Sequence, residues 1–145
     1  MIKILILGAG AMGSAFSVPC IDRNHQVTIV GTLLEDQFID NLNSNKKFHP
    51  ILELNLSDNT NIVKYNNLED ELKKKPDLIV LGVNSKGIKW AAEQISKFSN
   101  DSILCPILLL VKGLSIYDNK YESLGDKVKR LLTNSGIKNI NISAV

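Results

Sequence analysis

The sequence predicts an α/β fold built on a doubly wound, mostly parallel sheet with helices on both faces. The first observation is an apolar run at residues 1–7 that ends in the glycine-rich stretch from Gly8 to Gly13. The second is that strand-like and helix-like patterns alternate along the chain, as they do in parallel sheets. The third is that 145 residues, 44% of them hydrophobic, suffice for one domain with a buried core.

The elements follow in order from the apolar patterns. The first strand occupies residues 1–7, and a helix opens at Ser14 directly after the glycines. Further strands are predicted at residues 25–30, 61–65, 77–83, 103–111 and 137–142, and further helices at residues 35–42, 68–74, 87–98 and 121–133. The turn-rich stretch 43–60 is predicted to be a long loop. Six strands meet the requirement of a Rossmann-type sheet.

The glycine spacing G-x-G-x-x-G assigns a separate task to each glycine. Gly8 permits a tight turn, Gly10 lets the backbone approach phosphates, and Gly13 lets the helix pack close to the strand. Because backbone N–H groups and the helix dipole meet at this turn, it is suited to the pyrophosphate of a dinucleotide. The alternative is a strand-to-helix turn that binds nothing.

The end of the second strand leaves the choice between NAD and NADP open. A site selective for NAD places Asp or Glu about 20 residues beyond the glycine motif, and this chain has Thr32 there. Glu35 and Asp36 follow and are interpreted as the beginning of the next helix, where acids favour the dipole; the alternative is that one of them contacts ribose. No arginine stands nearby for a 2′-phosphate.

Lys112 marks the end of another buried strand and precedes Gly113. A lysine at the active edge of a parallel sheet can direct its ammonium group at a phosphate or a polarised carbonyl. The alternative is an ordinary strand terminator that seeks solvent.

Composition excludes several other classes of protein. A net charge of +2 with 22% charged residues leaves no dense basic stripe, so neither nucleic acid nor a membrane is an expected partner. The one lysine run, 73–75, is interpreted as a solvated helix end. Cys20 and Cys105 are expected in the core of a protein from a reducing compartment, and no spacing suggests a metal site. The chain lacks a signal peptide or a transmembrane segment, so a cytoplasmic location is expected.

Several of these motifs together resemble the N-terminal cofactor domain of the NAD(P)-dependent glycerol-3-phosphate dehydrogenases. The resemblance covers essentially the whole chain and rests on residues 8–13, 27–31, 45–50, 54–56, 83–85 and, above all, Lys112-Gly113. It implies that Lys112 contacts both substrate and cofactor as a catalytic residue. It also implies that Ala11 and Met12 lie along the phosphates, Thr32 faces the adenosine ribose and Asn84 borders the nicotinamide. The candidate cofactor-binding residues are Gly8, Ala9, Gly10, Ala11, Met12, Gly13, Thr32, Val83, Asn84 and Lys112.

The sequence departs from the family's pattern at three of these positions. Met12 stands where an aromatic is usual, Thr32 where a basic residue is common, and Asn84 where proline is usual, which predicts a less constrained backbone there. The ketopantoate reductases have a similar glycine turn, but they tend to have an asparagine-glycine pair in place of Lys112-Gly113.

The resemblance also implies a larger protein. Residues 1–145 correspond to a dinucleotide-binding domain, and the family continues into a helical substrate domain with a second catalytic lysine, which this chain lacks. The expected parent enzyme interconverts dihydroxyacetone phosphate and sn-glycerol 3-phosphate with NAD(P)H, in glycerol phosphate metabolism and phospholipid biosynthesis. Its partners would be the dinucleotide, a small phosphorylated substrate and a second subunit bound through the missing domain. The alternatives are a ketopantoate-reductase-like enzyme domain and a non-catalytic nucleotide-binding module.

Overall fold

The computed structural model describes residues 1–99 and 105–145. The helices are α1 (Ala11–Asp22), α2 (Asp36–Ser44), the short 3-10 helix η1 (Tyr65–Asn67), α3 (Leu68–Lys73), α4 (Ile88–Phe98) and α5 (Leu124–Asn134). The strands are β1 (Lys3–Leu7), β2 (Gln26–Val30), β3 (Phe48–His49), β4 (Leu54–Asn55), β5 (Asn61–Val63), β6 (Leu78–Leu81), β7 (Ile107–Leu109), β8 (Leu114–Tyr117), β9 (Lys120–Ser123) and β10 (Ile142–Ala144).

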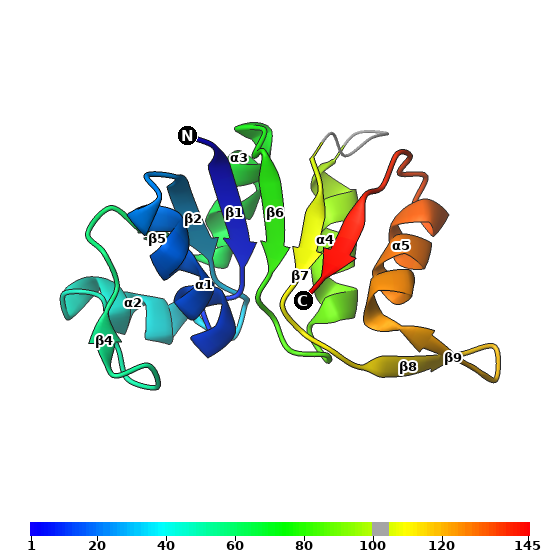
Figure 1. The fold of residues 1–145 in the computed structure, drawn as a ribbon, viewed down its shortest axis with the longest axis horizontal. Helices are drawn as coiled ribbons and strands as arrows, with labels where there is room; N and C mark the ends of the chain where they lie inside the picture. Colours follow the sequence, from blue (N-terminus) through cyan, green and yellow to red (C-terminus); the bar gives the residue numbers. More distant parts are fainter. Residues whose placement is uncertain (100–104) are drawn as a thin grey trace.

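The main sheet confirms the predicted fold class. Its six strands run in the order β10-β7-β6-β1-β2-β5, and every neighbouring pair is parallel. The winding reverses between β1 and β6, because the chain passes from β1 outward to β5 and then returns to β6 (Figure 1). The carboxyl ends of all six strands therefore meet at one edge of the sheet.

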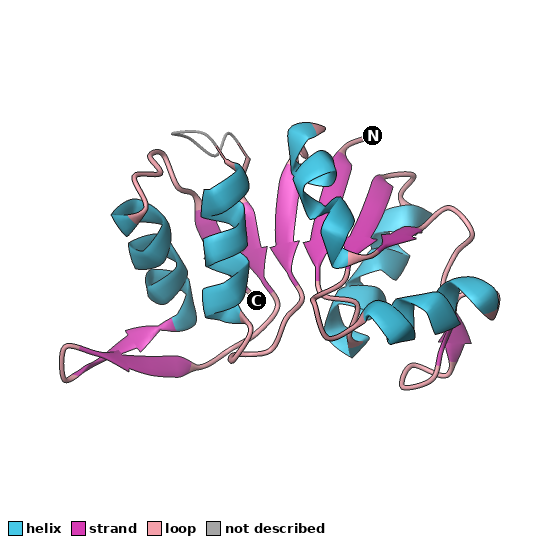
Figure 2. Cartoon of the chain, turned by 180° about the vertical axis from the view of Figure 1, so that it is seen from behind, coloured by secondary structure: helices cyan, strands magenta, loops and turns pink. Residues whose placement is uncertain are grey.

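Two apolar layers hold the helices against the sheet. On one face, α4 packs residues 88, 91, 92 and 95, a helical spacing of three and four, against β1, β6 and β7, and α3 and α5 join the same cluster. On the other face, the buried side chains of α1 and α2 pack against β1 and β2. Figure 2 views the molecule from the opposite side to Figure 1, and in this view α3, α4 and α5 lie in front of the sheet. Cys20 and Cys105 are buried and unpaired, as expected of core thiols, and burial raises the pKa of both.

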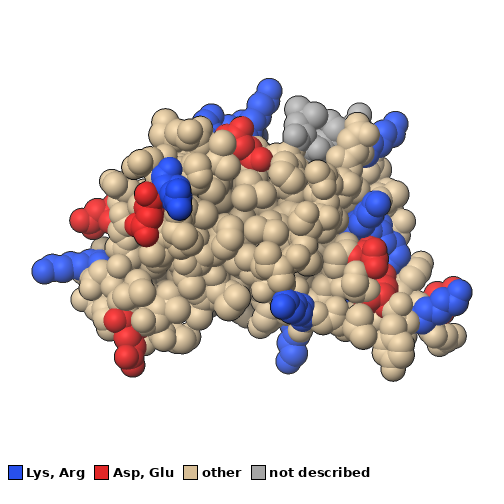
Figure 3. Space-filling model, in the orientation of Figure 1, with Lys and Arg blue, Asp and Glu red and all other residues tan. Residues whose placement is uncertain are grey.

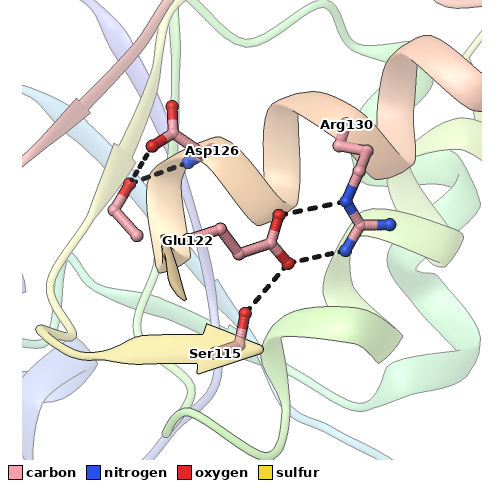
Figure 4. A network of polar contacts seen from close by, with 5 residues as sticks. Ser115, Glu122, Asp126 and Arg130 are labelled. Carbon is pink, nitrogen blue, oxygen red and sulfur yellow. Dashed lines mark hydrogen bonds and ion pairs between the residues drawn. The ribbon is translucent and has the colours of Figure 1, made fainter. Parts of the chain in front are cut away.

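A second small antiparallel pair, β8 and β9, was not predicted and corrects the start of the last helix. Residues 121–123 form strand, and α5 begins only at Leu124, where the Ser123 hydroxyl accepts the Asp126 N–H at 3.1 Å. Figure 4 shows the hydrogen bonds that join β8 and β9 to α5. Arg130 of α5 donates twice to the carboxylate of Glu122 in β9, at 2.6 and 3.0 Å, and Ser115 of β8 donates to the same carboxylate. Arg130 also stacks on Tyr117, 3.7 Å from the ring centre. These contacts hold the β8–β9 pair, which follows β7 in the chain, against α5.

The last strand also differs from the prediction. The strand expected at residues 137–142 begins only at Ile142, paired with Ile107. Ile137 is buried in the core, but Gly136 and Asn139 have positive φ angles of 86° and 56°, which no strand allows. The alternating apolar residues here belong to an irregular connection that buries Ile137 in the core, and not to a strand.

Other boundaries agree more closely. The helix predicted at 87–98 is α4, and the lysine run closes α3, where Lys73 and Lys74 pair with Glu69 and Glu71. The stretch 43–60 contains the short pair β3 and β4, which was not predicted. Of the strand predicted at 103–111, residues 103 and 104 lie outside the described residues, and β7 spans Ile107–Leu109.

Candidate functional site

A cleft of about 870 Å³ lies at the carboxyl ends of the parallel strands, where the winding reverses. Its lining residues come from the turns after β1, β2, β6 and β7 and from the first turns of α1 and α4: Gly10, Ala11, Met12, Thr32, Leu33, Leu34, Glu35, Gly82, Val83, Asn84, Lys86, Gly87, Trp90, Leu110, Val111 and Lys112. A smaller hollow of about 540 Å³ lies at the opposite edge, near Lys3 and His25. On the face shown in Figure 3, charged side chains of both signs lie toward the rim, and the middle is free of them.

Seven of the ten predicted site residues line this cleft. Gly10, Ala11, Met12, Thr32, Val83, Asn84 and Lys112 line it, whereas Gly8, Ala9 and Gly13 do not. Gly8 has a φ of 105°, the left-handed region that favours glycine. A Cβ on Gly13 would overlap the carbonyl oxygen of Gly8, so the glycine lets α1 approach β1. This agrees with the packing role predicted for Gly13.

Gly10 needs its small size for a different reason. A Cβ placed on it would meet only the Oε1 of Glu35, at 3.9 Å, and its backbone is extended with φ −65° and ψ 178°. Any residue can adopt that conformation, so neither packing nor backbone strain within the described protein requires glycine here. A side chain would project into the cleft. The absent Cβ thus leaves room for something that approaches the backbone closely.

The backbone beside Gly10 presents unpaired donors to that space. Ser14 N–H makes the first helical bond, to Gly10 O at 3.0 Å. The N–H groups of Gly10, Ala11 and Met12 donate to no acceptor within residues 1–99 and 105–145. Donors at the start of a helix are suited to phosphate oxygens. The residues present therefore fit the pyrophosphate of a dinucleotide.

The carbonyl of Ala9 fixes the direction of one of these donors. It accepts the Ser14 hydroxyl at 3.0 Å and lies 3.3 Å from Nε2 of His49, which is fully buried. The peptide bond between Ala9 and Gly10 is trans, so holding this carbonyl inward turns the Gly10 N–H outward. Ser14 and His49 were not predicted as parts of the site. Nothing in their sequence context indicated that they converge on one carbonyl.

Glu35 stands at the N-cap of α2, at the start of the predicted helix. Asp36 lies in the first turn of α2, as expected, but the Glu35 side chain turns back toward the glycine turn. Its Oε2 accepts the N–H of Thr32 at 2.7 Å and that of Ala9 at 3.2 Å. The carboxylate therefore joins the ends of β1 and β2.

Asn84 and Lys112 occupy the turns after β6 and β7. The Oδ1 of Asn84 accepts the N–H groups of Lys86 and Gly87, both at 3.1 Å, so side-chain bonds constrain a turn that was expected to be looser without proline. Lys112 is exposed. The next residue, Gly113, has a φ of 151°, and its carbonyl accepts the Leu124 N–H at 3.2 Å. This bond anchors the lysine's turn to α5.

The described residues hold neither a candidate metal-binding cluster nor a candidate membrane-spanning helix. Among the described residues, no group of three His, Cys, Asp or Glu side chains is placed to hold a metal ion. None of the described helices has both the length and the apolar character needed to span a bilayer.

Comparisons with known proteins identify the family and agree with the fold. A family profile described as the NAD-dependent glycerol-3-phosphate dehydrogenase N-terminus matches residues 3–140. The chain is 33% identical over 128 residues to the NADP(+)-dependent glycerol-3-phosphate dehydrogenase of Archaeoglobus fulgidus, covering 88% of this chain and 36% of that protein. It is 31% identical over 117 residues to glycerol-3-phosphate dehydrogenase [NAD(P)+] of Shouchella clausii, covering 79% and 32%.

A solved structure shows the same fold. The glycerol-3-phosphate dehydrogenase of Coxiella burnetii superimposes with a TM-score of 0.73 at 15% identity, over 99% of this chain and 40% of that one. The chain thus spans about a third of the length of the curated relatives named above. On the profile match across residues 3–140, the chain belongs to the family of the NAD-dependent glycerol-3-phosphate dehydrogenase N-terminal domain.

Proposed function

We propose that this chain is the cofactor-binding part of an enzyme that interconverts dihydroxyacetone phosphate and sn-glycerol 3-phosphate. The cofactor is NAD or NADP, as in the family to which the chain belongs. The observation that carries the proposal is the shared cleft: Lys112 lines the same space as the unpaired N–H groups of the glycine turn. A cationic side chain and a phosphate-binding turn therefore face the same ligand in this proposal.

The residues have distinct tasks in this proposal. The turn from Gly8 to Gly13 binds the pyrophosphate, with Ala11 and Met12 along it, while Thr32 borders the adenosine ribose. Val83 and Asn84 border the nicotinamide, which supplies or accepts the hydride when bound. Lys112 orients the substrate and stabilises charge on its oxygen, since an ammonium group is a compact cation with three donors.

A second domain completes the substrate site in this proposal. Support comes from the curated relatives, of which the chain spans only 36% and 32%. Hydride transfer needs a carbonyl held at close distance and a proton for its oxygen, and in this proposal the cleft contributes Lys112 toward this. A small phosphorylated substrate, a homodimer formed through the second domain, a cytoplasmic location and a role in phospholipid biosynthesis belong to the same proposal, and no nucleic acid is a partner.

The activity can be tested by joining this chain to the C-terminal part of the Archaeoglobus fulgidus relative. The expected result is oxidation of NADH or NADPH, followed at 340 nm, when dihydroxyacetone phosphate is added. Ketopantoate should give no turnover; if ketopantoate alone is reduced, the ketopantoate-reductase alternative replaces the proposal.

Lys112→Ala in the same fusion tests the role of the lysine. Loss of one such charge-stabilising donor should lower kcat by roughly 100-fold or more. Lys120→Ala, which changes an exposed lysine of β9 outside the cleft, is the matched control and should leave kcat unchanged. Cofactor binding without turnover of either substrate favours the non-catalytic nucleotide-binding module.

A further inference from the structure

The acid beside the glycine turn bears on which dinucleotide the cleft accepts. Glu35 lines the cleft together with Gly10 and Thr32. Its side chain is held in place because Oε2 accepts two backbone N–H groups, those of Thr32 and Ala9. A carboxylate fixed by backbone donors on two different turns is a feature of the folded site rather than a freely rotating surface group.

The other oxygen of the same carboxylate remains available. Oε1 of Glu35 makes no hydrogen bond within the described ranges 1–99 and 105–145, and it lies 3.9 Å from the position of a Cβ on Gly10. It therefore borders the open space beside the phosphate-binding turn, at the end of β2. In folds of this topology, the adenosine ribose lies at the end of this strand, and a carboxylate there accepts its hydroxyl hydrogens.

The surrounding charge makes that position unfavourable for a phosphate. Residues 24–45 contain no lysine or arginine. This stretch covers the turn after α1, then β2, the loop that follows β2, and α2. The cations that line the cleft, Lys86 and Lys112, come from the turns after β6 and β7. A 2′-phosphate beside Glu35 would meet a fixed negative charge without a positive charge from the same loop.

We infer that Glu35 is the residue that determines dinucleotide specificity in this chain, and that it selects NAD over NADP. The inference rests on the proposed dinucleotide site. Glu35 binds the ribose hydroxyls through Oε1, keeps its place through Oε2 and repels a 2′-phosphate. Thr32 donates its backbone N–H to hold the acid.

Isothermal titration calorimetry of the 145-residue chain with NADH and NADPH tests this directly. The expected result is a Kd for NADH at least about tenfold lower than that for NADPH. The ratio should shrink as salt concentration rises, because salt screens the repulsion of the 2′-phosphate. Neither measurement depends on a variant. Equal affinities, or tighter binding of NADPH, would overturn the assignment of specificity and leave the dinucleotide site intact.

Glu35→Gln removes the charge while keeping the side chain's size. Binding of NADPH should tighten relative to NADH by roughly the discrimination seen in the parent chain, and a thermal unfolding curve checks that the variant is folded. Asp36→Asn removes the same charge from the adjacent exposed position outside the cleft and should leave the ratio unchanged. If both variants change the ratio equally, general charge rather than Glu35 sets the preference. Absence of binding by either nucleotide to the parent chain would contradict the proposed cofactor site itself.

Discussion

The Nε2 atom of His49 lies 3.3 Å from the carbonyl oxygen of Ala9, 40 positions earlier in the chain. The other ring nitrogen, Nδ1, accepts the N–H of Leu52 at 3.3 Å. Because Nδ1 acts as an acceptor, Nε2 carries the hydrogen and donates it to Ala9. The imidazole, fully buried and edge-on to Phe38, thus connects the segment after α2 to the glycine turn.

His49→Leu should destabilise the protein and weaken dinucleotide binding. The substitution keeps an apolar side chain in the core but leaves the Leu52 N–H without its acceptor, a loss of about 1–3 kcal/mol. Urea unfolding measures the first effect and the calorimetric Kd for NADH the second. His25→Leu is the control, since His25 lies at the opposite edge of the sheet. Similar loss of NADH affinity in both variants would contradict a specific link between His49 and the turn.

Two helical glycines should respond oppositely to alanine. A Cβ on Gly13 would overlap the Gly8 carbonyl, so Gly13→Ala should cost at least about 1–3 kcal/mol by forcing α1 away from β1. A Cβ on Gly125 of α5 would lie 3.7 Å from its nearest neighbours, an ordinary contact. Gly125→Ala should therefore be neutral or stabilising by up to about 1 kcal/mol. Equal free energies of unfolding for the two variants would rule out the close approach of α1 and β1.

The bond between Glu122 and Arg130 should make the β8–β9 pair sensitive to acid. Hydrogen bonding from Arg130 lowers the pKa of Glu122 below its ordinary value. A carboxylate with a lowered folded-state pKa contributes stability above its unfolded pKa and loses it as pH falls through the folded pKa. NMR titration of residues 114–123 should report a midpoint on the acid side of the ordinary glutamate range.

Arg130→Met provides the control for that titration. It removes the donor, so the Glu122 midpoint should move upward and the β8–β9 signals should change at a higher pH. An unchanged midpoint would show that the ion pair is not formed in solution.

The sequence predicted elements well where burial alone sets the pattern. Strands β1 and β6 are continuous apolar runs covered on both faces, and α4 has a regular apolar stripe. The β8–β9 pair was missed because its apolar side chains, among them Leu114 and Ile116, are 68% and 70% exposed and follow no core pattern. The last strand was misplaced because Ile137 is buried from a turn.

The same distinction applies to the site, where roles set by the local backbone could be predicted and roles set by distant contacts could not. The glycine tasks follow from local backbone chemistry, so spacing suffices to predict them. The reach of Glu35 depends on how residues 31–34 fold back, and the position of His49 depends on a contact across 40 residues. Local sequence patterns contain no information on either distance.

Calorimetric titration of the chain and of Gly10→Val with NADH tests the central claim most directly. The Gly10 backbone is accessible to valine and its Cβ position is open, so the variant should unfold within about 1 kcal/mol of the parent chain. Its side chain would fill the space beside the unpaired N–H groups, so NADH affinity should fall by roughly 100-fold or more. Folded Gly10→Val that binds NADH as tightly as the parent chain would contradict the placement of the dinucleotide at this turn.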